Sequence, residues 1–215
     1  MMTQSSANPA IDLNERPFAV RFSKCDSADR GELERFIRDI FRQTYGAEIK
    51  RFKPYLMSLR DHDDKLIAAC GLYSATTGRL FLECYLDQPI EALLSTHAGL
   101  PLKRSDIVEI GDFSVAELGM ARYLITAIND QLHFTSKQWA VFTATPALRD
   151  AYIKLGMNPE ILADVDINRL PPEDRTAWGN YFEQKQQVMV IRRMERRNKP
   201  RISEPGISLA RRSEP

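Results

Sequence analysis

The sequence has few of the features that mark membrane-spanning and secreted proteins. Its longest apolar runs, such as residues 66–73, are far shorter than the roughly 18 to 20 residues that a helix needs to cross a bilayer. The first residues show no basic segment followed by an apolar one, so they do not resemble a secretory signal. We therefore expect a cytoplasmic protein without a transmembrane segment.

Cysteine and histidine are scarce, with three of each among 215 residues. The cysteines are odd in number and widely spaced, and Cys70 and Cys84 lie inside apolar runs, so neither a disulfide framework nor a zinc site is indicated. No two histidines have the spacing of metal ligands. The sequence therefore predicts reduced, buried thiols at Cys25, Cys70 and Cys84, and no metal. A cysteine and histidine nucleophile pair stays open, since such residues meet only in space.

A large net charge is also lacking, because the formal sum is +1, but the C-terminal end is basic. Residues 191–215 hold eight Lys or Arg against three Glu. Such a segment favours anionic membrane surfaces, yet it has neither the apolar face of an interfacial helix nor the aromatic residues of a single-strand binder. We expect a disordered basic tail over 192–215 with at most weak membrane contact, and no nucleic-acid partner.

The rest of the composition is typical of one soluble globular domain. Apolar residues make up 43% of the chain and charged residues 27%. This length supports one sizeable α/β core, which we place over residues 17–191. Residues 1–16 are polar and without periodicity, so we expect them to be disordered.

Apolar periodicity predicts the elements of the first half. Alternation over 18–25 predicts a strand, and helical spacing over 27–46 predicts a helix that stops at a glycine. Two strand-like runs joined by the polar tip 60–65 predict an antiparallel hairpin. A short strand is expected over 81–86, followed by a helix that begins near Pro89.

Strands and helices alternate in the second half, which predicts an α/β fold with a mixed sheet. A segment of loop or short helix is expected over 168–181. The expected strands are 106–115, 139–144, 158–167 and 186–193, and the expected helices are 118–134 and 146–156.

Two stretches are candidates for chemistry. The helix after the strand 106–115 begins with the small residues Gly119 and Ala121, and a helix N-terminus with small residues suits a phosphate group as well as it suits tight packing. The second stretch is VFTATPALRDAYIKLGM, in which Tyr152 either packs its helix on the sheet or acts as a proton donor. These residues alone decide neither case.

The order of strand, small-residue turn, helix, strand and a helix ending in AYIKLGM resembles the acetyltransferase superfamily known as GNAT, over about residues 18–190. The resemblance implies a three-layer GNAT-like fold, with a mixed, mostly antiparallel central sheet flanked by helices. It also implies that the turn at Gly119 and Ala121 holds the pyrophosphate of coenzyme A.

A closer resemblance is carried by FLECYLDQPIEALL, IVEIGDFSV, VFTATPALRDAYIKLGM and WGNYFEQKQQVMV. These four segments, in this order, resemble the thermostable hemolysin family, bacterial proteins similar to GNAT enzymes and to acyl-homoserine lactone synthases. The family name records a lytic activity, whereas the fold resemblance implies an acyltransferase.

The chain departs from the GNAT pattern at two positions. Ala116 stands where that pattern has an arginine or glutamine, so the basic or amide anchor for coenzyme A is absent. Thr145 replaces the asparagine that commonly opens the last helix, and its hydroxyl is still able to cap that helix. Both acyl-CoA and an acyl group on a carrier protein are therefore expected as possible donors, with no tightly bound cofactor.

The resemblance assigns a role to each candidate residue. The backbone N–H groups of Phe113, Ser114 and Val115 would polarise the thioester carbonyl. Glu109 would accept a proton from the attacking amine, and Tyr152 would protonate the leaving thiolate.

Two further carboxylates, Asp112 and Glu83, are additional candidates for a direct role in the reaction, and each is alternatively a solvated or salt-bridged strand residue. The resulting hypothesis is an N-acyltransferase that moves an acyl group from a thioester to a small-molecule amine. The alternative is a non-enzymatic cytolysin or a lipid-binding protein. An enzyme that makes a surface-active acylated product would lyse cells without inserting into the membrane.

Overall fold

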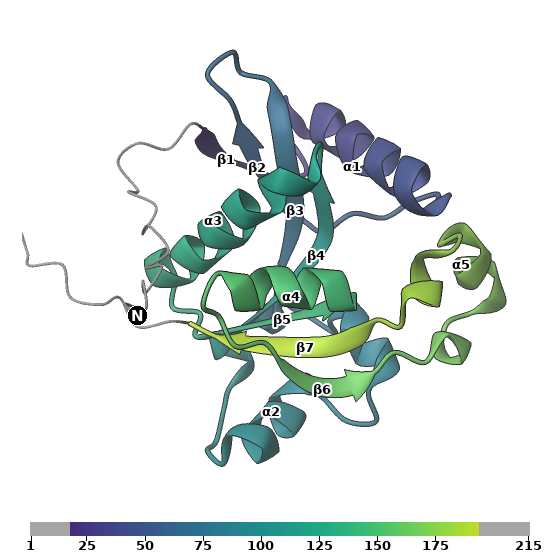
Figure 1. The fold of residues 1–215 in the computed structure, drawn as a ribbon. Coiled ribbons are helices and arrows are strands. Elements are labelled where there is room, and N and C mark those ends of the chain that lie inside the picture. The colour runs from purple at the N-terminus through teal and green to yellow at the C-terminus, as the bar shows by residue number, and fades with distance from the viewer. Residues whose placement is uncertain (1–17, 194–215) are drawn as a thin grey trace, which may run out of the picture.

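The computed structural model describes residues 18–193, which form one seven-stranded sheet with helices on both faces (Figure 1). The disorder predicted for residues 1–16 and for most of the basic tail 192–215 lies outside the described residues, while Arg192, the first residue of that tail, is the last residue of strand 187–192. Neighbouring strands run antiparallel except for the central pair β4 and β5, which is parallel. The expected mixed, mostly antiparallel sheet is confirmed. In spatial order the strands are β1 (Ala19–Ser23), β2 (Tyr55–Arg60), β3 (Leu66–Ser74), β4 (Ile107–Val115), β5 (Trp139–Ala144), β7 (Gln187–Arg192) and β6 (Glu160–Asp164).

Five α-helices are formed by the described residues, and the four longer ones bury apolar side chains in the cores. In the first of them Leu33, Ile37 and Phe41 are buried, as helical spacing predicts, and the helix stops at Gly46 in the left-handed conformation with φ 66°. The helices are α1 (Arg30–Tyr45), α2 (Ile90–Ala98), α3 (Ala121–Phe134), α4 (Pro146–Lys154) and α5 (Pro172–Ala177).

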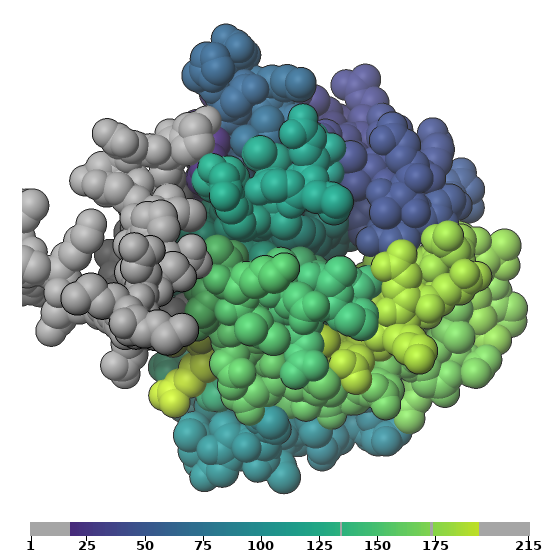
Figure 2. All heavy atoms as spheres, viewed as in Figure 1, coloured from purple at the N-terminus to yellow at the C-terminus, as the bar shows by residue number. Residues whose placement is uncertain are grey.

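Alternation along β4 sends its side chains into two of the three hydrophobic cores of the described residues, the third of which lies under α1. Val108 and Ile110 point to the face covered by α3 and α4, whereas Ile107 belongs to the core on the opposite face, beside α2. Figure 1 shows α3 and α4 on the same side of the sheet, and Figure 2 shows this side filled by their side chains, with α5 and the residues after it beside α4. The side chain of residue 109 therefore lies on the face away from α3 and α4.

The strand predicted over 81–86 is wrong, because residues Phe81–Tyr85 form a 3₁₀ helix, η2. The backbone N–H groups at its start donate to carboxylates instead of to a neighbouring strand. Leu80 donates to Glu83, and Phe81 and Leu82 donate to Glu109. Local apolar alternation does not reveal such acceptors, since Glu109 lies on a strand far along the chain.

The segment 168–181, expected as loop or short helix, contains α5 and is fixed to the end of α1. Asn180 N–H donates to the Tyr45 carbonyl at 2.9 Å, and Glu48 N–H donates to the Ala177 carbonyl. Gly179 has φ +55°, and a Cβ there would lie 2.1 Å from the Tyr45 carbonyl oxygen. Only glycine allows this close contact.

Candidate active site

The two parallel central strands separate part of the way along their length. They pair only from Ile107 with Trp139 to Ile110 with Phe142. Beyond these residues β4 stays paired with β3, and β5 stays paired with β7. The sheet therefore has an opening between residues 111–115 of β4 and the end of β5, and we call this the β4–β5 opening. Inside this opening, the facing edges of β4 and β5 are not hydrogen-bonded to each other.

The register identifies one backbone donor that faces the opening. Ala116 N–H donates to the Ile67 carbonyl at 2.9 Å, on the β3 side. Since successive residues of a strand point their N–H groups in opposite directions, Val115 N–H faces the opening and Ser114 N–H faces β3. Phe113 lies within an irregular part of the strand, where alternation does not fix the direction.

That irregularity is a β-bulge. Ala69 pairs with Ser114 while Gly71 pairs with Gly111, so β4 holds one extra residue there. Asp112 within the bulge has φ 54°, a conformation that few residues other than glycine adopt. Bulges of this kind redirect side chains, and this one turns β4 where it leaves β5.

Asp112 is half-buried as a residue, and its carboxylate accepts a hydrogen bond from Lys53 N–H at 3.2 Å. Burial raises the pKa of Asp112, while the Lys53 ammonium and this N–H oppose the rise. The negative charge of Glu109 adds to it. The Asp112 carboxyl is therefore more basic than an ordinary aspartate.

Lys53 is a site residue that the sequence analysis missed. Its stem lies across two paired glycines, since a Cβ on Gly71 would come within 2.5 Å of Lys53 Cγ and a Cβ on Gly111 within 2.8 Å of Lys53 Cε. Its Nζ lies 2.8 Å from Glu109 Oε2 and 5.4 Å from the ring centroid of Phe81. A glycine inside a strand often marks a place where another group lies close to the backbone. Gly71 and Gly111 are therefore the features of the sequence that could have indicated this contact.

Glu109 is almost fully buried, with 3% of its surface exposed. Its carboxylate accepts Phe81 N–H at 2.9 Å and Leu82 N–H at 3.1 Å, besides the ion pair with Lys53. These contacts occupy both oxygens and fix the start of η2 to β4. They are the contacts of a positioning group, and the proton-acceptor role predicted for Glu109 stays a prediction.

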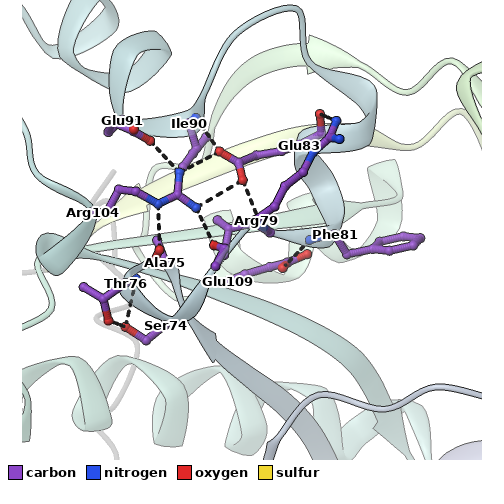
Figure 3. A network of polar contacts seen from close by, with 12 residues as sticks. Ser74, Ala75, Thr76, Arg79, Phe81, Glu83, Ile90, Glu91, Arg104 and Glu109 are labelled. Atoms are coloured by element: carbon purple, nitrogen blue, oxygen red, sulfur yellow. Dashed lines mark hydrogen bonds and ion pairs between the residues drawn. The ribbon is translucent and has the colours of Figure 1, made fainter.

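Glu83 lies in a separate polar network (Figure 3). Its carboxylate accepts Leu80 N–H at 2.7 Å and Ile90 N–H at 2.8 Å, and it binds both terminal nitrogens of Arg104. Arg104 also donates to the carbonyls of residues 75 and 78 and to Glu91. Burial raises the pKa of Glu83, but Arg104 and the two N–H groups together lower it below its ordinary value. This network anchors the loop that carries η2.

Tyr152 does not share a face of the sheet with Glu109. It is 1% exposed on the side of α3 and α4, and its ring stacks on Phe142 with centroids 4.9 Å apart. Burial, followed by the nearby Cys70, raises the pKa of its hydroxyl, so Tyr152 keeps its proton. The structure thus places Tyr152 and Glu109 on opposite sides of the strands that border the opening.

Three more predicted residues lie at helix starts. Thr145 Oγ1 accepts Leu148 N–H at 3.2 Å and caps α4, as expected. A 3₁₀ turn precedes Ala121, the first residue of α3, and this end has no side-chain cap. A Cβ on Gly119 would meet no atom within 4 Å, so packing does not require glycine there.

Aromatic residues gather beside the end of β5. Burial raises the pKa of Tyr181 to about 12, opposed by a side-chain hydrogen bond with Thr143 on β5. Trp178 contacts the rings of Tyr181 and Phe81 with centroids 5.1 and 5.8 Å apart. Beside the end of β5 lies a hollow of about 560 Å³, and its lining includes Phe182. Sequence reasoning did not single out these aromatic residues, because Trp178 and Tyr181 come from the segment expected only as loop or short helix and Phe182 directly follows it.

The thiol prediction holds in part. Cys70 is buried and Cys84 half-buried, whereas Cys25 is exposed, so a buried thiol at Cys25 is wrong. Among residues 18–193 no group of His, Cys, Asp and Glu is arranged to hold a metal ion. In the same part of the chain, none of the helices combines the length and the apolar character that crossing a membrane requires.

Several solved structures share this fold. The acyl-homoserine lactone synthase LasI aligns over 81% of this chain and 89% of its own, with TM-score 0.55 and 14% identity. MesI, a CoA-dependent acyl-homoserine lactone synthase, aligns over 82% and 89% with TM-score 0.53 and 15% identity. A candidate N-acetyltransferase from Lactobacillus plantarum aligns over 83% and 100%, with TM-score 0.53 and 11% identity. At these identities the likeness shows the GNAT-like fold alone.

No curated protein sequence is significantly similar to the chain. A family model, Thermostable hemolysin, matches residues 23–196, which include nearly all the described elements and the β4–β5 opening. The chain therefore belongs to the thermostable hemolysin family.

Proposed function

We propose that the protein is an N-acyltransferase, which moves an acyl group from a coenzyme A or acyl-carrier thioester to a small-molecule amine. The β4–β5 opening is the observation that carries this proposal. It brings an unpaired backbone N–H, a carboxylate of raised basicity and a buried ammonium group into one part of the sheet. Acyl transfer needs such a polarising donor and such a proton acceptor at one place.

The donor thioester enters from the start of α3 in this proposal. The uncapped N–H groups there suit a phosphate, and Gly119 and Ala121 leave room for it. The thioester carbonyl then lies at the opening, where Val115 N–H is directed towards it. Structures of similar fold include MesI and BjaI, both described as CoA-dependent, and this likeness supports acyl-CoA as donor. Ala116 lacks the basic anchor, so an acyl-carrier protein stays the alternative.

The predicted catalytic pair takes two different roles. Tyr152, which keeps its proton, donates a hydrogen bond to the thiolate as it leaves, and the thiolate takes the proton that the nitrogen loses. Glu109 holds the start of η2 and the Lys53 ammonium at the opening. A reaction of this kind uses donors that are made inside cells, so we also propose a cytoplasmic location.

The second candidate function, a non-enzymatic cytolysin, is favoured by the family name alone. Hemolysis is explained equally by an acylated, surface-active product.

One paired experiment separates the two functions. Purified protein is heated with and without a series of acyl-CoA probes, and the same preparation is added to dye-loaded liposomes without substrate. The proposal expects a rise in melting temperature with acyl-CoA and no leakage. Leakage without any acyl donor, together with an unchanged melting temperature, would support the cytolysin instead.

A further inference from the structure

We propose that the Asp112 carboxylate binds the ammonium group of a cationic amine acceptor and accepts a proton from it. Lys53 and Glu109, which form an ion pair beside Asp112, act as positioning residues. This inference rests on the proposed acyl transfer and names both its acceptor class and its proton acceptor. Four observations carry it.

The first is the position of Asp112. Its bulge lies where β4 leaves β5, and its φ of 54° is kept in spite of the strain that this conformation imposes on a residue with a Cβ. A Cβ on Gly71 would come within 2.5 Å of Asp112 Oδ2, so the carboxylate lies close above the glycine of the neighbouring strand. The bulge thus places this carboxylate over β3, at the level where β4 leaves β5.

The second is the number of its partners. Within residues 18–193, only Lys53 N–H donates a hydrogen bond to the Asp112 carboxylate, at Oδ2. Glu109 receives two N–H groups and an ammonium, and Glu83 receives two N–H groups and a guanidinium. Of these three carboxylates, Asp112 alone has an oxygen, Oδ1, that receives no hydrogen bond from the described residues.

The third is the balance of charge. Lys53 is paired with Glu109, and Arg30 is paired with Glu34 at 2.7 Å while it donates to the carbonyls of residues 53 and 54. The negative charge of Asp112 is left without a dedicated partner. A cationic acceptor supplies that partner, whereas an anionic acceptor meets repulsion.

The fourth is the chemistry of the step. An ammonium ion gives one proton to the Asp112 carboxylate, and the neutral amine attacks the thioester carbonyl, forming the C–N bond. The C–S bond then breaks, and the second proton lost by nitrogen passes to the thiolate. Asp112 returns its proton to solvent, so that an ammonium ion and a thioester become an amide, a thiol and one proton. Burial already makes this carboxyl more basic, which suits a proton acceptor at neutral pH.

The test compares two nucleophiles in wild type and Asp112→Asn. Asparagine has the same shape and tolerates a positive φ, so the bulge is kept. Butylamine is protonated at neutral pH, whereas hydroxylamine is neutral and needs no acceptor for a first proton. Thiol release from an acyl-CoA probe is measured with each. Asp63→Asn serves as matched control, because it removes a carboxylate from an exposed hairpin tip.

We expect Asp112→Asn to slow transfer to butylamine by about 100-fold or more and transfer to hydroxylamine by less than about fivefold. The pH profile of the rate with butylamine should lose its acid-side inflection. The titratable and charged groups that face Asp112 and influence this inflection are Lys53, Glu109, Arg30, Cys70 and Tyr181. Equal losses with both nucleophiles, or no loss with butylamine, would overturn the inference.

Two outcomes separate this inference from the proposed function. A wild-type protein that acylates hydroxylamine but not butylamine contradicts the cationic acceptor and leaves acyl transfer standing. A wild-type protein that acylates neither contradicts both. If circular dichroism shows that Asp112→Asn is misfolded, Asp112→Glu is used instead, because it keeps the negative charge. The expected result is then a pH profile with butylamine that keeps the acid-side inflection. Its absence in a folded Asp112→Glu overturns the inference.

Discussion

At the scale of single residues, two carboxylates three positions apart on β4 have opposite surroundings. Glu109 is enclosed and bonded to two backbone N–H groups and Lys53, whereas Asp112 accepts one N–H. A buried and fully bonded carboxylate contributes to stability, while one with spare acceptor capacity is available for a substrate. Substitutions at the two positions should therefore affect different properties.

Glu109→Gln should lower the free energy of unfolding by about 3 kcal/mol, because it leaves the Lys53 ammonium without its charged partner. Urea denaturation of wild type and variant measures this loss. Glu117→Gln, an exposed change on the loop after β4, is the control and should stay within about 0.5 kcal/mol.

A double variant with Lys53→Met checks the cause. Because the two side chains form one pair, the combined loss should be clearly smaller than the sum of the single losses. Additive losses would show that Glu109 and Lys53 stabilise the protein independently.

Gly179→Ala should lower the free energy of unfolding by more than about 2 kcal/mol, since the added Cβ meets the Tyr45 carbonyl oxygen at 2.1 Å and φ is +55°. Gly119→Ala is the matched control, because no atom lies within 4 Å of its added Cβ. Thermal melting of both variants measures the difference. Equal melting temperatures would contradict the tight contact between α1 and the residues after α5.

Residue roles were harder to predict than residue positions. The sequence places Glu109, Asp112 and Tyr152 on their elements, but it does not tell which side of the sheet each faces near a bulge. Lys53 precedes a strand in an unremarkable polar stretch, and its role depends on two glycines that are 40 residues apart in the chain. Contacts of that kind become visible only in three dimensions.

At the scale of elements, the loop between β3 and β4 is held by charge. Arg104, near the end of the loop, binds the carbonyls of residues 75 and 78 at its start and Glu83 in η2, and Glu109 fixes η2 against the sheet (Figure 3). Since η2 borders the site through Phe81, its position depends on the protonation state of Glu83.

This dependence gives a pH prediction. Arg104 and two N–H groups lower the folded-state pKa of Glu83 from its ordinary value of 4.5, although burial opposes them. The stability that Glu83 contributes is therefore complete above pH 4.5 and is lost as pH falls through the lowered folded-state value. Glu83→Gln should be less stable than wild type at pH 7, and the difference should shrink below pH 4.5. Urea denaturation from pH 7 to pH 3 measures it, and a difference that does not change with pH would contradict the lowered pKa.

Most elements are predictable from local pattern, because strand alternation and helical spacing are local signals. The exception, 81–86, has strand-like alternation but gives its first N–H groups to carboxylates of Glu83 and Glu109. An acceptor that comes from a distant strand leaves no trace in local periodicity. The β4–β5 opening is likewise set by register, which depends on neighbouring strands.

At the scale of the whole molecule, the fold and the chemistry are separate claims. The chain shares its architecture with LasI over 81% of its length at 14% identity, so very different side chains support the same sheet. The order of elements was enough to predict that architecture. The proposed reaction depends on a few side chains at the opening.

The central claim is acyl transfer at the β4–β5 opening, and mass spectrometry of the product tests it most directly. Purified protein is mixed with an acyl-CoA probe and a primary amine, and the mixture is searched for the mass of the corresponding amide. The account predicts this amide with wild type and Asp63→Asn and about 100-fold less of it with Asp112→Asn. Intact thioester and amine with wild type, across short and long acyl probes and an acyl-carrier donor, would contradict it.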